Sequence, residues 1–124
     1  MNQQFEDGLK IRKQVMGESF VERAFAGADE FTQPLQDFIT ANAWGTVWCR
    51  DGLELKTRSL ITLAMLTALG RTKELQGHVR GALNNGATVE EIREVLLHAT
   101  VYCGVPLAVD AFRAAQEVLK KPAE

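Results

Sequence analysis

Residues 88–106 read TVEEIREVLLHATVYCGVP and carry the clearest helical pattern in the chain. Thr88 and Glu91 have the spacing of a capping box, in which each side chain bonds the backbone N–H of the other residue at a helix start. Apolar residues then recur at steps of three and four, the period of one buried helix face. Gly104 ends this pattern, and Pro106 suits the start of the next helix. The stretch predicts two consecutive helices, the first with an apolar seam of Val89, Ile92, Leu96, Ala99 and Cys103.

The residues before this stretch continue the helical pattern upstream. Asp51 and Glu54 have the spacing of a carboxylate capping box before a helix predicted over 54–69, which Gly70 is placed to end. From Leu60 on, this helix is apolar almost all round, which predicts burial on every side, by its own fold or by another subunit. Because 124 residues offer little material to surround such a helix, we predict a homo-oligomer.

The N-terminal part also reads as helical. We predict helices over 5–15 and 19–26, the second capped by Ser19, and a further helix with Pro34 among its first residues. Residues 44–53, WGTVWCRDGL, are aromatic and contain glycine, and we expect them to lead into a loop. Strand alternation and hairpin signals are missing from the sequence. The prediction is therefore an all-α fold of about six or seven helices, forming a single domain over 1–124.

Composition narrows the function classes. Apolar residues make up 46% of the chain and charged residues 24%, which favours a packed core over disorder. The formal net charge of −2 argues against a nucleic-acid partner. The sequence shows no secretory signal, and its longest near-apolar run, 60–69, is too short to span a bilayer. Cys49 and Cys103 form no CxxC and no metal-ligand cluster with histidine, so we expect a cytoplasmic protein with two free thiols, no metal and no membrane partner.

Glu74 and His78 are the leading candidates for chemistry. They lie four residues apart in the predicted helix 74–83, beside an apolar stripe centred on Leu75. A carboxylate next to an imidazole favours the imidazolium, which would make a cationic donor or a proton shuttle near neutral pH. The alternative is an ordinary surface pair between residues four apart, which stabilises a helix by roughly 0.2–0.5 kcal/mol.

Other polar residues are second-rank candidates. Arg58, one turn after Glu54, either forms a salt bridge with it or clamps a ligand carboxylate with its planar fork. His98 and Tyr102, again four apart, either donate to a ligand or pack with one satisfied polar end. Arg80 points to the side of its helix opposite His78. It is solvated in a monomer, but it could reach another chain's site across an interface.

For the tryptophans and for Cys103, packing roles are at least as well supported by the sequence as roles in a site. Trp44 and Trp48 either wall a pocket or pack in a core or a subunit interface. Cys103 on the apolar seam reads as a small core residue rather than as a nucleophile.

The residues from about 44 to 118 closely resemble the carboxymuconolactone decarboxylase family. The resemblance is carried by R-D-G-L, K-T-R-S-L, E-L-x-x-H-V-R-x-A-L, N-G-A-T-x-E-E-I and Y-C-G-V-P, which are specific in combination. It implies the all-α fold of the alkylhydroperoxidase D-type proteins and a ring-like homohexamer. Those peroxidases carry C-x-x-C-x-x-x-H on the corresponding helix. Here Arg71 and Glu74 stand at the two cysteine positions and only His78 is kept, which removes a disulfide route.

The resemblance also implies an activity and roles for the candidates. The implied reaction is cofactor-independent decarboxylation of 4-carboxymuconolactone, a lactone dicarboxylate, in the protocatechuate branch of the β-ketoadipate pathway. Glu74 and His78 are then the expected catalytic residues. Alternatives are an enzyme of this fold acting on another lactone or keto acid, and a non-catalytic oligomeric binding protein. The expected substrate-binding residues are Arg58, Arg80, His98 and Tyr102.

Overall fold

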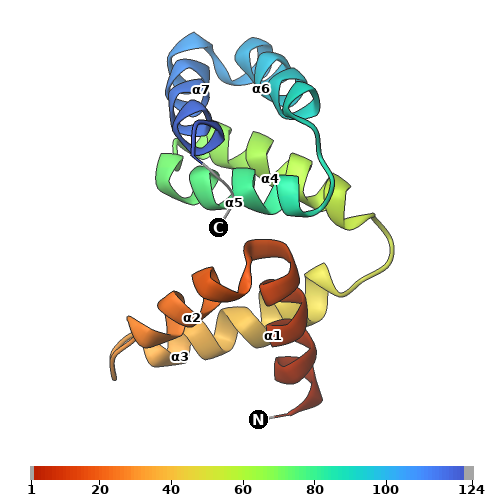
Figure 1. Ribbon diagram of the computed structural model, residues 1–124, viewed down its shortest axis with the longest axis vertical. Helices are drawn as coiled ribbons and strands as arrows, with labels where there is room; N and C mark the ends of the chain where they lie inside the picture. The colour runs from red at the N-terminus through yellow and green to blue at the C-terminus, as the bar shows by residue number, and fades with distance from the viewer. Residues whose placement is uncertain (1, 122–124) are drawn as a thin grey trace. The chain divides into compact units, whose positions relative to one another are not determined.

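In the computed structural model, which describes residues 2–121, the chain is all-α. It forms two compact units, unit 1 (Met1–Leu55) and unit 2 (Lys56–Glu124), shown in Figure 1. The all-α prediction is confirmed: the described residues form seven α-helices and one π-helix, and none of them forms a strand. Unit 1 holds α1 (Gln3–Met16), α2 (Glu18–Ala26), α3 (Gln33–Phe38) and the π-helix η1 (Ile39–Trp48).

Unit 1 is built on the contact between α1 and η1. The Gln4 amide nitrogen donates to the Ala41 carbonyl at 2.8 Å and to the Thr46 hydroxyl at 2.7 Å, tying the two helices together. Gly8, on the same side of α1, lets the backbones approach closely, since a Cβ there would meet the Thr40 carbonyl and lie 2.7 Å from the Gly45 nitrogen. A small core packs nearby around Val15, Met16, Val21 and Trp44.

The structure refines one local prediction for unit 1 and contradicts another. Trp44 and Trp48 lie in η1, with their rings stacked at a centroid distance of 4.6 Å, and the loop expected within residues 44–53 follows from Cys49 on. Ser19 does not cap α2, because the helix already begins at Glu18 with Gly17 as its N-cap. Gly17 has φ 97°, a conformation that glycine adopts without strain, and it therefore separates α1 from α2 within one residue.

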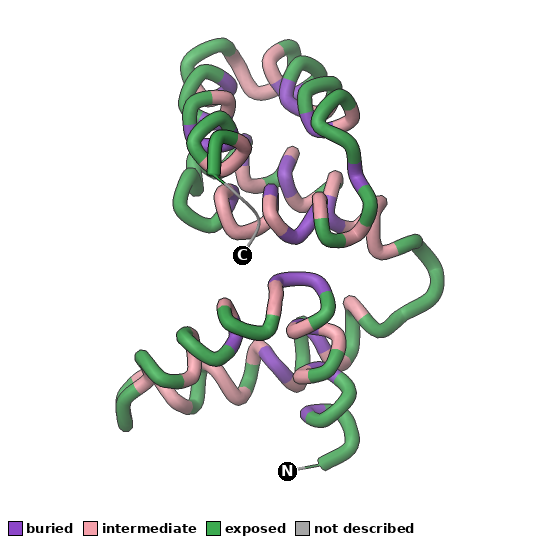
Figure 2. Tube along the Cα trace, in the orientation of Figure 1, coloured by how far each residue is buried: buried purple, intermediate pink, exposed green. Residues whose placement is uncertain are grey.

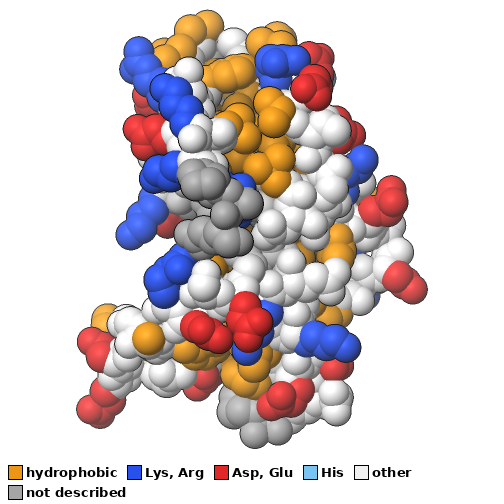
Figure 3. All heavy atoms as spheres, in the orientation of Figure 1, with side chains coloured by type: hydrophobic (Ala, Val, Ile, Leu, Met, Phe, Trp, Pro, Cys, Tyr) orange, Lys and Arg blue, Asp and Glu red, His pale blue; other side chains and the backbone are white. Residues whose placement is uncertain are grey.

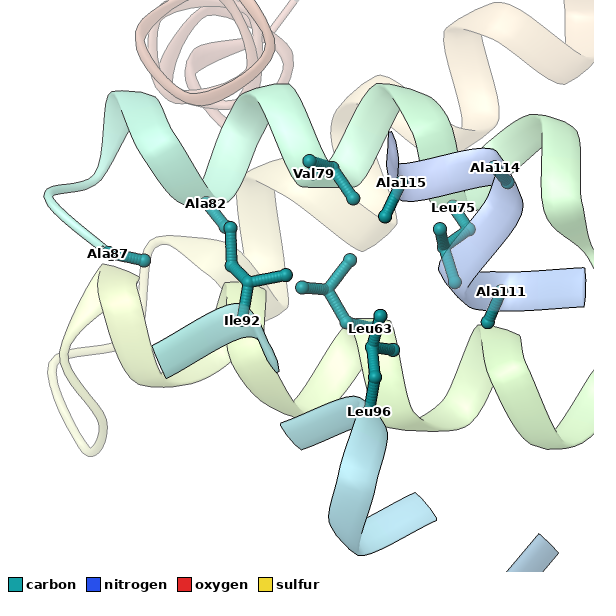
Figure 4. Packing of buried hydrophobic residues seen from close by; sticks show 10 residues of the cluster. All are labelled: Leu63, Leu75, Val79, Ala82, Ala87, Ile92, Leu96, Ala111, Ala114 and Ala115. Carbon is teal, nitrogen blue, oxygen red and sulfur yellow. The ribbon is translucent and has the colours of Figure 1, made fainter. Parts of the chain in front are cut away.

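Unit 2 is a four-helix arrangement around one apolar core. Buried positions alternate with exposed ones along its helices (Figure 2). Figure 4 shows core side chains from all four helices pointing toward one another, with Leu63 at the centre. The capping box is present as predicted: the Thr88 backbone N–H donates to the Glu91 carboxylate at 2.9 Å, and the Glu91 N–H donates back to the Thr88 hydroxyl at 3.0 Å. The helices are α4 (Leu55–Leu69), α5 (Thr72–Asn84), α6 (Val89–Cys103) and α7 (Val105–Leu119).

The helix α4 is not buried on every side within the chain. Its buried residues, Ser59, Leu63 and Thr67, form one stripe at four-residue spacing. Ile61, Met65 and Leu69 form a second stripe that is exposed, with Leu69 exposing 71% of its surface. The chain alone therefore leaves an apolar side of α4 facing solvent.

Candidate active site

The helix α5 positions His78. Leu75, Val79 and Ala82 are fully buried and fix which side of α5 faces the core of unit 2. At 100° per residue, His78 lies about 60° from Leu75, on the flank that also carries Arg71 and Glu74. The imidazole is half-buried at the edge of the core. The predicted placement of Glu74 and His78 on one flank of this helix is thus confirmed.

The protonation state expected for His78 was wrong. Burial lowers the pKa of His78 from 6.5 to about 4, and the negative charge of Glu74 raises it only in part. Desolvation of the imidazolium outweighs the carboxylate because Glu74 is itself exposed, so that water screens its charge. At neutral pH the side chain is therefore a neutral imidazole, with one N–H donor and one acceptor nitrogen.

Glu74 has a close partner that the sequence analysis did not assign. The Arg71 Nε donates to the Glu74 Oε1 at 2.9 Å, and this bond lowers the pKa of Glu74 and raises that of Arg71. Glu74 is therefore a fixed anion at neutral pH. The Arg-x-x-Glu spacing at a helix start could have indicated this pair, but Arg71 was interpreted only as the position of a missing cysteine.

Arg58 lies near the start of α4, on the same helical hairpin as His78. The Asn85 side-chain amide donates to the Ser59 hydroxyl at 2.9 Å, which joins the end of α5 to the start of α4. His78 is seven residues before Asn85, and at 1.5 Å per residue this places it about 10 Å further along the hairpin. The half-buried Arg58 and His78 are thus offset along the hairpin by about two helical turns.

The remaining candidates lie elsewhere in unit 2. Arg80 is on the flank opposite His78, as expected, but it is half-buried rather than solvated, because its Nη2 donates to the Val118 carbonyl of α7 at 3.2 Å. His98 and Tyr102 lie on the exposed side of α6, with their ring centroids 5.0 Å apart. Tyr102 exposes 78% of its surface. Of the polar candidates that the structure describes on α5 and at its N-cap, Glu74 and Arg71 share the flank of His78.

The aromatic and thiol candidates of unit 1 lie together. Trp48 and Cys49 line a cavity of about 550 Å³ together with Lys10 and Arg50. The Cys49 thiol donates to the Asp7 carbonyl at 3.7 Å, and burial together with the Asp7 charge raises its pKa. Cys49 is thus a poor nucleophile at neutral pH. Cys49 and Cys103 are both free, as predicted.

Comparison with known proteins gives the family. The model of the carboxymuconolactone decarboxylase family matches residues 33–117. The chain belongs to this family. It is 49% identical over 115 residues to the nitrosuccinic acid decarboxylase of Metarhizium robertsii, an alignment covering 93% of this chain and 80% of that protein. It is 45% identical over 118 residues to the 4-carboxymuconolactone decarboxylase of Acinetobacter baylyi, covering 95% and 88%.

The family membership has two direct consequences. The chain is a carboxy-lyase, because the family and both relatives are decarboxylases. The resemblance read from the sequence motifs is confirmed, and the N-terminal helices outside the family model are covered by the relatives. Within residues 2–121, we find no helix with the length and hydropathy needed to cross a membrane.

The neutral state of His78 predicts a pH effect on stability. Below pH 6.5 an unfolded chain protonates this imidazole, whereas the folded chain does not until about pH 4. Acid therefore favours unfolding over this window, by at most about 1.4 kcal/mol per pH unit. The free energy of unfolding, measured with urea at fixed protein concentration, should fall between pH 6.5 and 5 less steeply in His78→Gln than in the wild type. Identical slopes would contradict a buried neutral His78.

Proposed function

We propose that this enzyme removes CO2 from 4-carboxymuconolactone and forms the β-ketoadipate enol-lactone. The reaction belongs to the protocatechuate branch of the β-ketoadipate pathway, and the cytoplasm is the expected location. The identity to the Acinetobacter baylyi enzyme over nearly the whole chain supports the substrate. The observation that carries the mechanism is the half-buried His78 at the edge of the core, whose pKa burial lowers to about 4, since the neutral imidazole keeps one N–H that can donate to a developing oxyanion.

The substrate contains its own electron sink. Breaking the bond between the ring carbon and its carboxylate releases CO2 and leaves an electron pair on that carbon. The ring double bond conjugates this pair into the lactone carbonyl and gives a dienolate. A proton then adds to the ring carbon next to the lactone carbonyl, which leaves the double bond at the carbon that lost CO2 and yields the enol-lactone. The scheme balances without a separate electron acceptor, so the protein has to supply binding and charge stabilisation, and we propose that water supplies the proton.

The residues of the α4–α5 hairpin divide these tasks. His78 donates its imidazole N–H to the lactone oxygen on which charge grows. Its conjugate acid is scarce at neutral pH because the pKa is about 4, so we propose this role over direct proton delivery from an imidazolium. Arg58 binds a carboxylate of the substrate through its guanidinium fork. Glu74, held by Arg71, acts as a positioning residue that biases the orientation and charge of the imidazole.

Three further residues are proposed to act between copies of the chain. Arg80, His98 and Tyr102 lie outside the flank that carries His78, so each would contribute to substrate binding only at a neighbouring copy's site. Such sharing fits a homo-oligomer, for which we propose a hexamer.

A second substrate class is favoured by the relative from Metarhizium robertsii. That protein is a nitrosuccinic acid decarboxylase, and it is as similar to this chain as the Acinetobacter baylyi enzyme is. In nitrosuccinic acid, one carboxylate is on the carbon that bears the nitro group, and its loss places the electron pair in a nitronate. The nitronate oxygens, like the lactone oxygen, take up the developing negative charge. The same hydrogen-bond donor and the same arginine clamp would suit both dicarboxylates.

A comparison of kcat/KM for the two candidate substrates tests the function. The purified enzyme is given each acid separately, and CO2 release is measured together with the ultraviolet loss of the lactone. We expect kcat/KM to be larger for 4-carboxymuconolactone. A larger value for nitrosuccinic acid would reassign the substrate, and binding of either acid without CO2 release would support a binding protein.

The clamp role of Arg58 is tested by Arg58→Lys. An ammonium keeps the charge but cannot form two parallel hydrogen bonds to one carboxylate, so kcat/KM should fall about tenfold or more, equivalent to about 1.4 kcal/mol. Steady-state kinetics measures this loss. Arg23→Lys is the matched control, because that arginine is exposed on α2. An unchanged kcat/KM in Arg58→Lys would indicate that Arg58 has only a structural role.

The exposed side of α4 predicts association. Ile61, Met65 and Leu69 expose an apolar stripe that a soluble enzyme covers with another subunit. Light scattering at micromolar concentration should give the mass of a stable homo-oligomer. Met65→Lys, in the middle of the stripe, should lower that mass. A monomeric mass for the wild type would contradict this prediction and show that the apolar stripe on α4 stays exposed to water.

A further inference from the structure

A second apolar surface lies between α6 and α7 and differs from the stripe on α4 by its charge. Its floor is formed by Ile92, Leu96, Phe112 and Leu119, and the groove has a volume of about 570 Å³. Three cations line it and no carboxylate does, among the part of the chain that the structure describes. Figure 3 shows hydrophobic side chains gathered on this face of unit 2, with basic side chains beside them. We call it the basic groove; its cations are Arg93, Arg113 and Lys120.

Unit 1 carries a segment with the complementary properties. Residues 29–38 read DEFTQPLQDF and contain three carboxylates and no lysine or arginine. Within this acidic segment, Phe31, Leu35 and Phe38 expose 90%, 57% and 64% of their surfaces. Leu35 and Phe38 lie in α3 and Phe31 lies in the turn before it, so the three side chains are spaced i, i+4 and i+7 along the segment, as anchors that enter a groove often are.

The acidic segment is held in shape before any partner binds. The Thr32 backbone N–H donates to the Asp29 carboxylate at 3.0 Å, and the Asp29 N–H donates to the Thr32 hydroxyl at 3.0 Å. The Gln33 amide donates to the Asp37 carboxylate at 3.0 Å within α3. Since these bonds already fix the turn and the short helix, little conformational freedom remains to be lost on docking.

We propose that the basic groove of one copy binds the acidic segment of a second copy of this chain. The three aromatic and aliphatic anchors cover the apolar floor, and three carboxylates meet three cations at its edges. A neutral or basic partner would leave the cations of the groove unmatched, which favours an acidic occupant. Because each chain carries one groove and one segment, each copy both gives and receives this contact.

Two charge-reversed variants test the contact. The segment variant carries Glu30→Lys and Asp37→Lys, and the groove variant carries Arg93→Glu and Lys120→Glu. Glu30, Arg93 and Lys120 are exposed, whereas Asp37 is half-buried and accepts from Gln33, so circular dichroism checks that both variants keep the wild-type helix content. We expect each variant alone to associate at least tenfold more weakly than the wild type in a dilution series followed by light scattering. Glu22→Lys on α2 and Lys73→Glu on α5 are matched exposed controls that should associate like the wild type.

Mixing the two variants decides whether the contact forms between copies. The lysine-bearing segment of one chain faces the glutamate-bearing groove of the other, and the unchanged segment and groove also match. An equimolar mixture should therefore recover the wild-type mass. A chain carrying all four changes should recover it as well. If the four-change chain recovers but the mixture does not, the segment binds its own groove and the proposal is overturned.

The same measurement separates this inference from the proposed function and assembly. Unchanged association of both variants, in a wild type that is oligomeric, overturns the contact alone. A monomeric wild type overturns the contact together with the proposed association on which it rests. None of these outcomes uses the decarboxylase activity, so failure of the substrate proposal would leave the masses and their interpretation unchanged.

Discussion

His78→Ala is expected to lower kcat by about 10²–10³, equivalent to about 2.7–4 kcal/mol, with a much smaller change in KM. The reason is that the imidazole N–H interacts with charge that exists on the lactone oxygen only as CO2 departs. An interaction stronger in the transition state than in the ground state appears in kcat. Steady-state kinetics at saturating and limiting substrate separates the two parameters, with assembly and circular dichroism measured alongside.

The controls for this prediction lie on the same helix. Lys73→Ala changes an exposed neighbour on α5 and should keep the wild-type rate. A fully active, assembled His78→Ala enzyme would mean that His78 serves only in packing. In that event, Glu74 and His78 would form the ordinary helical pair that the sequence also allowed.

Glu74→Gln distinguishes a positioning residue from a catalytic one. The amide keeps the shape and can still accept from Arg71, but it removes the charge that raises the pKa of His78. The acid limb of the pH–rate profile should therefore move to lower pH, while kcat at neutral pH falls less than in His78→Ala. If Glu74 had only a structural role, Glu74→Gln would change the stability of the protein without moving the acid limb of the pH–rate profile.

The parts of the fold that follow local rules could be predicted from the sequence. The capping box at Thr88 and the break at Gly104 are decided by neighbours within one or two turns, and both are present. The apolar seam of α6 is buried at Ile92, Leu96 and Ala99, whereas Val89 at its start exposes 41% of its surface. For residues 44–53 only the approach to a loop was predicted, and the helical form of 44–48 was not, because the glycine and tryptophans there give no clear period. This helical form depends on α1, which lies about 40 residues earlier in the sequence and which local periodicity does not report.

In the candidate site, too, some features follow from local spacing and others depend on tertiary structure. The flank shared by Glu74 and His78 follows from helical spacing alone. The protonation state of His78 does not, because a pKa depends on burial as well as on the nearest charge, and burial is a tertiary property. The pair of Arg71 and Glu74 was overlooked for a different reason. The predicted helix began at residue 74, three residues after Arg71, whereas α5 begins at Thr72 with Arg71 as its N-cap, directly beside the first turn.

Gly8→Ala is expected to destabilise unit 1 by about 3 kcal/mol or more, at or above the upper end of the usual cost of overpacking. The added Cβ would meet the Thr40 carbonyl and lie 2.7 Å from the Gly45 nitrogen, and both are backbone atoms of η1 that no side-chain rotation can move. The backbones of α1 and η1 would have to separate, and the hydrogen bonds from Gln4 to η1 would lengthen with them.

Urea unfolding followed by tryptophan fluorescence measures this effect, because Trp44 and Trp48, the chain's two tryptophans, both lie in unit 1 and report on its packing. Gly52→Ala is the matched control. A Cβ at Gly52 meets nothing within 4 Å, so that variant should unfold at the wild-type urea concentration or slightly above it, since alanine restricts the unfolded chain. If Gly8→Ala instead unfolded together with Gly52→Ala, the close approach of α1 and η1 would not be what holds unit 1 together.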